Sequence, residues 1–343
     1  MTALRTGILV ILSLAQLLTL ACTYKDIPTE FPTPEPPPAA TPAPKLDLKP
    51  DVELEKQFAK IAEDAKGKVG VMAVVLETGE SASLNADQHF PMQSVYKLPI
   101  CMAVMDKVRL GELDLDEVIG VSKEDMVREG QASVLRDKNP DGGEFTIREL
   151  IRLALVESDG TASDLLLNAV GGPAEVQSYL TAIGVRDMRV VNSEKEMGQD
   201  WETQYQNWAT PESSVGLLRW LWTVHRSEVA GRPGPKEISK NCLSGYNLVF
   251  CYMADSTTGG NRLKSLDSGI RLKDWPPLIA HKTGTSGSRD KITAATNDIG
   301  LISIRGATNI AIAVYVSDSP GDLKTREAVI AKIAKAAYDR WNN

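Results

Sequence analysis

The chain has 343 residues, 43% of them hydrophobic and 24% charged, which is the balance of an ordinary globular protein. Its formal net charge is −7 and no block of Lys or Arg residues stands out, so the sequence carries no electrostatic footprint for binding nucleic acid. Without its N-terminal segment the chain is about 300 residues long, which fits one large domain or two closely packed lobes.

The first 21 residues have the composition of a secretory signal peptide. Arg5 precedes an apolar run from Gly7 to Ala21, and this run is shorter than the ~20 apolar residues that a membrane-spanning helix needs. The residues just before Cys22 resemble the lipobox of bacterial lipoproteins, so we expect cleavage and lipidation at this cysteine. Thr19 departs from the lipobox pattern, and plain signal-peptide cleavage or an uncleaved anchor are the alternatives.

A proline-rich segment follows at residues 22–50. Nine of the 19 prolines of the chain lie between Ile27 and Pro50, and such a stretch favours extended polyproline II, at ~3.1 Å per residue, over a packed core. We therefore expect a tether that holds a folded domain, residues 51–343, away from a membrane. These features predict a monomeric, exported lipoprotein of the bacterial cell envelope, in the periplasm or on the outer face of the membrane.

The other three cysteines give no sign of a metal site. Cys101, Cys242 and Cys251 occur in no Cys-x-x-Cys or Cys/His ligand spacing, so we expect no metal and no other cofactor. Cys242 and Cys251 lie nine residues apart in what reads as one helix, which would separate them by ~13 Å along its axis. The sequence therefore predicts buried thiols rather than a disulfide framework.

After the tether, the spacing of apolar residues predicts strands at both ends of the folded domain. Asp51 is a good N-cap for a first helix, whose buried face carries Leu54, Phe58, Ile61 and Ala62. The remaining expected elements are strands at Val69–Leu76 and after Gly79, helices at Ile100–Val108, Ile147–Val156, Ala162–Ala169 and Ser214–Val224, strands at Leu278–Lys282, Ile299–Ile304 and Ile310–Val316, and a helix at Asp322–Trp341.

This order of elements predicts how the chain is arranged in space. Neither the two strands at one end nor the three at the other make a stable sheet alone, so they pair with each other. The predicted fold is α/β (α+β): an antiparallel sheet built from both chain ends and flanked by helices, with an all-helical lobe inserted at about residues 90–255. A cleft between two lobes is a natural site for chemistry.

Ser94 and Lys97 are the first candidate catalytic pair. They lie one helical turn apart at the start of the inserted lobe, so the hydroxyl and the amine share a face. A lysine whose pKa is lowered by burial and positive neighbours can activate a serine, and a helix N-terminus favours a developing oxyanion. Ser-x-x-Lys alone is a weak signal, because it recurs at Ser288–Lys291, where no apolar helical run follows and we expect a polar loop.

Two further motifs follow in order along the chain. Ser158-Asp159-Gly160 lies at a helix end, and residues 281–285, with the sequence His-Lys-Thr-Gly-Thr, lie at the end of a predicted strand. With these three motifs the chain resembles the penicillin-recognising serine enzymes, from roughly Asp51 to the C-terminus. The resemblance implies a β-lactamase/transpeptidase-like fold.

Within that superfamily the chain resembles a class A serine β-lactamase most. The segments Asn192–Met197 and Gln204–Trp208 look like the Ω-loop of one class A branch, in which a glutamate activates the water that cleaves the acyl-enzyme. Glu194 is the residue that matches this glutamate. Glu196, two residues away, is its rival, and a solvated acid in a charged loop is the alternative.

The resemblance implies hydrolysis of a β-lactam, a small-molecule substrate, through a Ser94 acyl-enzyme. Ser94 attacks the lactam carbonyl, and Lys97 or Glu194 takes its proton. The backbone N–H groups of Ser94 and Thr285 hold the oxyanion, and Ser158 relays a proton to the departing nitrogen. Residues implied in substrate binding are Lys282, Thr283, Thr285, Arg262 and Gly160. For Arg262, the alternative is a lone surface arginine.

Two glycines depart from the family pattern. Gly160 stands where the family has an Asn that contacts the substrate, and losing one such hydrogen bond costs ~1–3 kcal/mol of binding. Gly198 stands four residues after Glu194, where Asn or His steadies the deacylating water. We therefore expect slow or selective turnover, and we expect Gly160→Asn to improve it.

Two other functions remain open from the sequence. A D,D-peptidase or penicillin-binding protein uses the same Ser-x-x-Lys and Lys-Thr-Gly motifs without a deacylating glutamate. A non-hydrolytic β-lactam sensor would be acylated and stay so, and the two glycines favour it. His89, His225 and His281 have no triad spacing, so we interpret them as residues of the fold.

Overall fold

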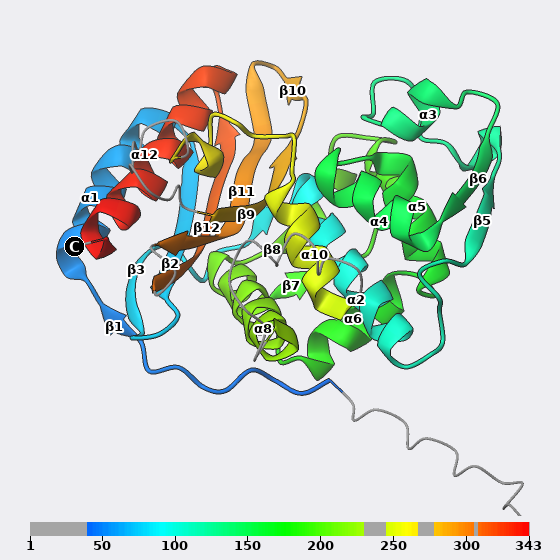
Figure 1. Ribbon diagram of the computed structural model, residues 1–343. Helices are drawn as coiled ribbons and strands as arrows, with labels where there is room; N and C mark the ends of the chain where they lie inside the picture. Colours follow the sequence, from blue (N-terminus) through cyan, green and yellow to red (C-terminus); the bar gives the residue numbers. More distant parts are fainter. Residues whose placement is uncertain (1–39, 230–244, 267–277, 305–307, 343) are drawn as a thin grey trace, which may run out of the picture. The chain divides into compact units, whose positions relative to one another are not determined.

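A seven-stranded sheet forms the centre of the part of the chain that the structure describes (Figure 1). A computed structural model describes residues 40–229, 245–266, 278–304 and 308–342. The strands along the sheet are β1 (Lys49–Pro50), β3 (Glu80–Leu84), β2 (Lys68–Val75), β12 (Thr308–Ser319), β11 (Ile292–Ile304) and β10 (Ser288–Arg289), with β9 (Leu278–Thr285) also paired to β11.

The two ends of the domain meet in this sheet, as the sequence predicts. β2 from the N-terminal side pairs antiparallel with β12 from the C-terminal side, with Val71 opposite Val314. β11 pairs antiparallel with both β12 and β9, and Ile299 faces Lys282 across the β9 pairing. β1 departs from the expected antiparallel order, because it runs parallel to β3.

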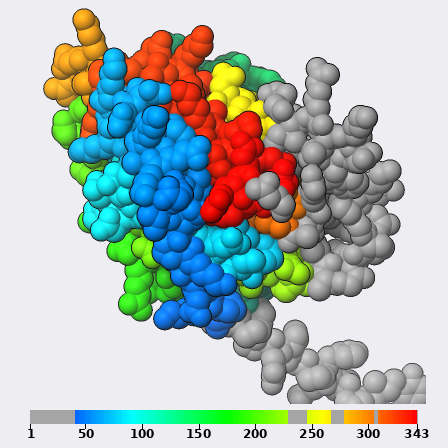
Figure 2. Space-filling model, turned by 90° about the vertical axis from the view of Figure 1, so that its left-hand side faces the viewer, coloured from blue at the N-terminus to red at the C-terminus, as the bar shows by residue number. Residues whose placement is uncertain are grey.

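Two helices from opposite ends of the domain cover one face of the sheet. They are α1 (Val52–Ala62), extended by the 3-10 helix η1 (Glu63–Ala65), and α12 (Leu323–Trp341), and Figure 2 shows them in blue and red next to each other. Asp51 and Asp322 cap them by accepting the backbone N–H groups of Leu54 and Thr325. The apolar faces of both helices, Phe58 and Ile333 among them, pack onto the sheet in one core.

The inserted region lies on the other face, and its core is larger. Its helices are α2 (Lys97–Arg109), α3 (Val134–Lys138), α4 (Ile147–Val156), α5 (Gly160–Ala169), α6 (Pro173–Ala182), α7 (Glu194–Met197), α8 (Pro211–Val229) and α10 (Gly245–Ala254), with 3-10 turns η2 (Gln93–Tyr96), η3 (Lys123–Asp125) and η4 (Thr203–Tyr205). A further 3-10 turn, η5 (Leu263–Ser265), packs instead against α12, β9 and β11. The sequence predicts an all-helical lobe for the inserted region, and this prediction is wrong. β4 (Phe90–Pro91), β8 (Trp208–Ala209) and β7 (Met188–Arg189) form a small sheet, and β5 (Val118–Val121) and β6 (Gly143–Thr146) form a second.

Helix α2 is the central element of the inserted region. Every residue from Lys97 to Met105 is buried, which is unusual for a helix and follows from its position among α4, α5, α6 and α10. The helix therefore has no solvent-facing stripe in its first half. This placement carries Lys97, its first residue, into the interior beside Ser94.

One prediction about the cysteines is wrong. Cys101 is a buried free thiol, as expected, and burial raises the pKa of its thiol to about 12. Cys251, in contrast, is disulfide-bonded, and its partner is not among the described residues. The expectation of a thiol assumed one helix running through residues 242–251, whereas α10 begins at Gly245, in a left-handed backbone conformation with φ +67°. Cys22 and Cys242 lie outside the described residues.

Residues 40–50, at the end of the proline-rich segment, contact the folded domain. The Trp220 indole N–H donates to the Thr41 carbonyl at 2.8 Å. The Lys49 N–H donates to the Gly79 carbonyl at 2.7 Å, where β1 joins the edge of the sheet. Among the helices of the described ranges, none is long and apolar enough to cross a membrane.

Gly79 allows residues 40–50 to lie against the sheet. Its φ is +78°, and a Cβ there would lie 2.0 Å from the Asp47 carbonyl oxygen. Gly111→Ala is a matched control, because Gly111 has φ +74° with nothing within 4 Å of its Cβ position. Gly79→Ala should therefore lower the free energy of unfolding by at least ~1 kcal/mol more than Gly111→Ala. Denaturant titrations of both variants measure the difference, and equal losses would show that the 40–50 contact adds no stability.

Candidate active site

Ser94 lies on the 3-10 turn η2, immediately before α2, rather than on the α-helix itself. This turn joins β4 to α2, and Gln93 within it has a left-handed backbone, φ +48°. The Gln93 side chain is held by a hydrogen bond of 2.8 Å from its Nε2 to Gln204 Oε1. This hydrogen bond holds the strained turn in place. Lys97 follows the turn as the first residue of α2.

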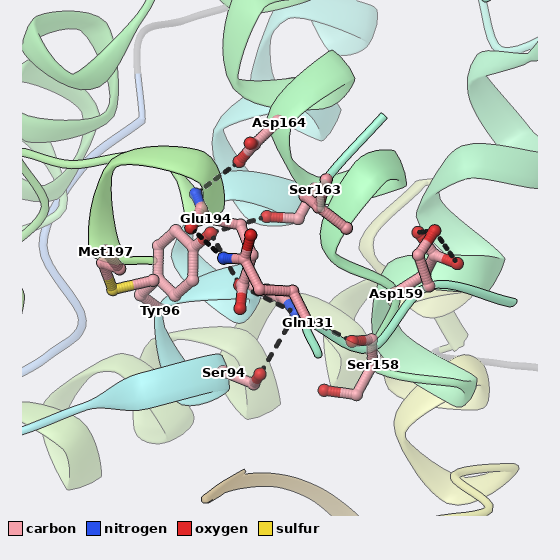
Figure 3. A network of polar contacts seen from close by, with 12 residues as sticks. Ser94, Tyr96, Gln131, Ser158, Asp159, Ser163, Asp164, Glu194 and Met197 are labelled. Atoms are coloured by element: carbon pink, nitrogen blue, oxygen red, sulfur yellow. Dashed lines mark hydrogen bonds and ion pairs between the residues drawn. The ribbon is translucent and has the colours of Figure 1, made fainter. Parts of the chain in front are cut away.

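The Lys97 amine joins the three segments that carry Ser94, Ser158 and Glu194. Its side chain is 1% exposed, and Nζ donates to Ser94 Oγ at 3.1 Å and to the Ser158 carbonyl at 2.7 Å. Nζ also lies 3.1 Å from Glu194 Oε2. Figure 3 shows Ser94, Ser158 and Glu194 converging from three different elements.

Ser158 lies in the loop between α4 and α5 and connects to the strand-end lysine. Its φ is +60°, a conformation that non-glycine residues rarely adopt, and Asp159 next to it caps α5 by accepting the Ala162 N–H at 2.9 Å. Lys282 Nζ donates to Ser158 Oγ at 2.8 Å. Burial, and then the positive charge of Lys97, lower the pKa of Lys282 to about 7. This amine is therefore able both to give and to take a proton near neutral pH.

The end of β9 lies against the turn that carries Ser94. A Cβ at Gly284 would lie 2.3 Å from the Met92 carbonyl oxygen and 3.3 Å from the Ser94 nitrogen, so a glycine is required for this approach. Thr283 is buried, and its hydroxyl lies 2.7 Å from that of Thr258. Thr285, the last residue of the strand, is exposed.

Arg262 is a buried residue, not a lone surface arginine. It forms an ion pair with Glu327 at 3.1 Å, and its Nη1 donates to the Asn297 carbonyl at 2.9 Å. Its Nη2 donates to Thr285 Oγ1 at 2.7 Å. The guanidinium therefore contacts the strand end through Thr285 and is anchored from behind by Glu327.

Two glutamates at the start of α7 have different surroundings. Glu194 is mostly buried, with a side chain 14% exposed that faces Lys97. Glu196 is exposed, and its Oε2 accepts the backbone N–H of Ser193 at 2.7 Å in a capping box. The geometry therefore favours Glu194 over Glu196 as the acid of the site.

The helix α7 is fixed onto α5 by a buried carboxylate. Asp164 Oδ1 and Oδ2 accept the N–H groups of Glu194 and Lys195 at 2.6 and 3.0 Å. Burial is the main reason why the pKa of Asp164 is raised to about 6, although these hydrogen bonds lower it.

Comparison with known proteins shows the family of this chain. The model of the β-lactamase enzyme family matches residues 53–341. The β-lactamase VEB-1 of Pseudomonas aeruginosa is 33% identical over 84% of this chain and 91% of its own length. The chain belongs to the class A serine β-lactamases. Two solved structures share the fold. The TLA-3 extended-spectrum β-lactamase is 34% identical, with a TM-score of 0.74, and the match covers 85% of this chain and 99% of that one. A class A β-lactamase from Bacteroides cellulosilyticus is 30% identical, with a TM-score of 0.71, and the match covers 86% of this chain and 99% of that one.

The two glycines that depart from the class A pattern both lie against Glu194 or its helix. A Cβ at Gly160 would lie 2.7 Å from Glu194 Cγ and 3.1 Å from the Ala132 carbonyl oxygen. A Cβ at Gly198 would lie 2.6 Å from Gln131 Nε2. The amide of Gln131 covers Gly198, and its Nε2 donates to the Glu194 carbonyl. The space that the glycines leave is therefore filled by Glu194 itself and by Gln131.

Sequence reasoning missed four residues that surround Glu194: Tyr96, Gln131, Ser163 and Asp164. Tyr96 lies inside the Ser-x-x-Lys motif, and its hydroxyl contacts both Ser163 Oγ and Glu194 Oε2. Asp164 lies about one helical turn after Gly160, the last residue of the Ser158 motif. Only Tyr96 and Asp164 carried a signal, as polar groups inside apolar helical runs, whereas nothing in the local sequence marks Gln131.

The histidines lie elsewhere. His89 stacks on Trp208 with ring centroids 3.6 Å apart, and His225 stacks on Phe250 at 4.0 Å. His281 Nδ1 pairs with the buried Asp298 at 2.9 Å.

The structure argues against the expected benefit of Gly160→Asn. Any side chain at residue 160 displaces Glu194, so Gly160→Ala and Gly160→Asn should each lower the turnover of a β-lactam by ~10–100-fold, since a shift of about 1 Å at a reacting group has this effect. Gly120→Ala is the control, because its Cβ meets nothing within 4 Å. Steady-state rates of the three variants check this, and faster turnover by either Gly160 variant would restore the original expectation.

Proposed function

We propose that this protein hydrolyses the β-lactam amide through a Ser94 acyl-enzyme, which a water activated by Glu194 then cleaves. One observation carries the proposal: a single buried amine, Lys97 Nζ, lies within 3.1 Å of both Ser94 Oγ and Glu194 Oε2. Acylation and deacylation need a hydroxyl, an amine and a carboxylate close together, and Lys97 holds Ser94 and Glu194 on either side of its amine.

In the proposed acylation, Ser94 Oγ attacks the lactam carbonyl and its proton passes to Lys97 or, through a water, to Glu194. Lys97 Nζ contacts Ser94 Oγ directly, and Glu194 lies on the other side of the same amine, so the contacts leave both paths open. The N–H groups of Ser94 and Thr285 stabilise the oxyanion. Gly284 supports this role of the two N–H groups, since it lets the strand end approach the nitrogen of Ser94.

The ring opens when its nitrogen receives a proton from Ser158. The Ser158 hydroxyl accepts a hydrogen bond from Lys282, whose pKa of about 7 lets it replace that proton. When protonated, Lys282 also attracts the carboxylate of the substrate, to which Thr283 and Thr285 donate hydrogen bonds. Arg262 acts in this scheme through Thr285, which it orients. Gly160, for which the sequence implied substrate binding, acts by making room for Glu194.

In the proposed deacylation, Glu194 takes a proton from the water that attacks the ester carbonyl. Its burial beside Lys97 keeps it in place, and the exposed Glu196, which caps its own helix, is not suited to this step. The presence of such a glutamate separates a hydrolase from a penicillin-binding protein or a sensor, which remain acylated.

Turnover of a chromogenic cephalosporin tests the proposal. We expect the purified chain to form product far beyond one equivalent, and Ser94→Ala to form none. Glu194→Gln should be acylated and then release product at least ~100-fold more slowly, because the water loses its base. Glu196→Gln is the matched control, two residues further along the same helix, and should turn over at the wild-type rate.

Mass spectrometry of the intact protein distinguishes the outcomes. A stable adduct on Glu194→Gln alone supports the mechanism. A burst of one equivalent with the wild-type chain indicates a sensor or a penicillin-binding protein. No adduct at all removes Ser94 from the mechanism, and normal release by Glu194→Gln removes Glu194.

We further infer from the sequence that the protein is exported and lipidated at Cys22, with the proline-rich segment as a tether. The support is the apolar run that ends at this cysteine and the prolines that follow it. Labelled palmitate should be incorporated into the full-length chain in a bacterial host, and Cys22→Ser should abolish the labelling. Labelling that persists in Cys22→Ser, or none in the wild type, contradicts lipidation at this residue.

A further inference from the structure

Tyr96 lies between Ser94 and Lys97 in the chain, but its side chain points toward Glu194 (Figure 3). The ring is fully buried, and its hydroxyl lies 3.2 Å from Glu194 Oε2 and 2.9 Å from Ser163 Oγ. A carboxylate only accepts hydrogen bonds, so the phenol donates its single proton to Glu194 and the Ser163 hydroxyl donates to the phenol oxygen. The three groups form a directed chain that ends on the carboxylate.

The second partner of Glu194 Oε2 is Lys97, and the two partners differ in one respect. Lys97 forms an ion pair with the carboxylate at 3.1 Å, and its charge changes on the path in which it takes the proton of Ser94. Tyr96 stays a neutral donor, because burial and then the negative charges of Glu194 and Asp164 raise the pKa of its phenol well above the ordinary value. Tyr96 is therefore the constant partner of this carboxylate.

The carboxylate has little other support. Gly198 has no side chain, and the Gln131 amide donates to the backbone carbonyl of Glu194 rather than to its carboxylate. Within the described part of the chain, Tyr96 and Lys97 are the two residues that bind the carboxylate, both at Oε2. No hydrogen bond from the described residues reaches Oε1, which leaves this oxygen for a water.

We propose that Tyr96 is a positioning residue for deacylation, whose hydroxyl holds Glu194 Oε2 so that Oε1 acts as the base toward the attacking water. This inference rests on the proposed function, in which Glu194 activates that water. The hydroxyl contacts neither Ser94 nor Lys97, so acylation does not depend on it where Lys97 takes the proton of Ser94.

The charged groups around Glu194 determine what the removal of this hydroxyl does. They are Lys97 from α2, Asp164 from α5 and Lys282 from β9, while Lys195 on α7 donates to the Glu124 carbonyl. Tyr96→Phe keeps all four and removes one hydrogen bond to the charged form of Glu194. Only the ionised form of Glu194 accepts that bond, so its loss should move the acidic limb of the deacylation rate to higher pH.

Tyr96→Phe in the full chain tests the proposal with a chromogenic cephalosporin. Stopped-flow traces should show acylation within twofold of wild type and deacylation about tenfold slower, the effect of one hydrogen bond to a charged group. The acidic limb of the deacylation rate should move up by about one pH unit. Unchanged deacylation with an unchanged acidic limb overturns the proposal.

Ser163→Ala is the matched control, because it removes the other hydrogen bond of the phenol and leaves its bond to Glu194. Its deacylation rate should stay within threefold of wild type, with the acidic limb in place. Equal losses in both variants without a shift of the limb would show a merely structural role for the tyrosine, and would overturn the proposal. Single-equivalent product from the wild type would instead refute the proposed function, which separates the two failures.

A second measurement decides the matter if Tyr96→Phe does not fold. Replacing the tyrosine at residue 96 alone by 3,5-difluorotyrosine keeps the hydroxyl and makes it a stronger donor. The acidic limb should then move to lower pH. A limb that stays at the wild-type position overturns the proposal.

Discussion

The burial of one ammonium group, that of Lys97, is the constraint on which the site depends. Transferring such a charge into a protein interior costs several kcal/mol unless it is paired and hydrogen-bonded. The fold meets this requirement with groups from three separate segments: Ser94 from η2, the Ser158 carbonyl from the loop before α5, and Glu194 from α7. Each of these partners stabilises the buried charge of Lys97. The contacts that stabilise this charge therefore also bring Ser94, Ser158 and Glu194 together.

Close backbone approach brings these segments together, and glycines make the approach possible. Gly284 lets β9 pass against the turn that carries Ser94, and Gly160 lets Glu194 lie over the start of α5. At each position a Cβ would come within 2.7 Å of a neighbouring atom. A glycine that departs from the family pattern is thus explained by the packing of this chain: Gly160 is matched to the position of Glu194, and Gln131 occupies the space over Gly198. The loss of one side chain from a site need not mean the loss of its function, because a neighbour from another segment fills the same volume.

The residues within the three motifs could be predicted from the sequence, and so could the sheet built from both chain ends. Those predictions rest on local patterns: one helical turn between Ser94 and Lys97, and β-branched runs at each end of the domain. What failed depends on contacts between distant segments. Gln131 and Glu194 are 63 residues apart, so no local pattern marks their contact. The two-residue strands of the small sheet are too short to show a period, and the disulfide of Cys251 was missed because a continuous helix was assumed.

The charges of the site come in like pairs, Lys97 with Lys282 and Glu194 with Asp164. Burial, and then the charge of Lys97, lower the pKa of Lys282 to about 7, while burial raises the pKa of Asp164 to about 6 with a smaller contribution from the charge of Glu194. Lys97 and Glu194 face each other as an ion pair. In the proposed acylation, Lys282 returns a proton to Ser158 along a hydrogen bond separate from the ion pair beside Ser94. In this arrangement Tyr96 is a donor to Glu194 that stays neutral, because burial and the neighbouring carboxylates raise the pKa of its phenol well above the ordinary value.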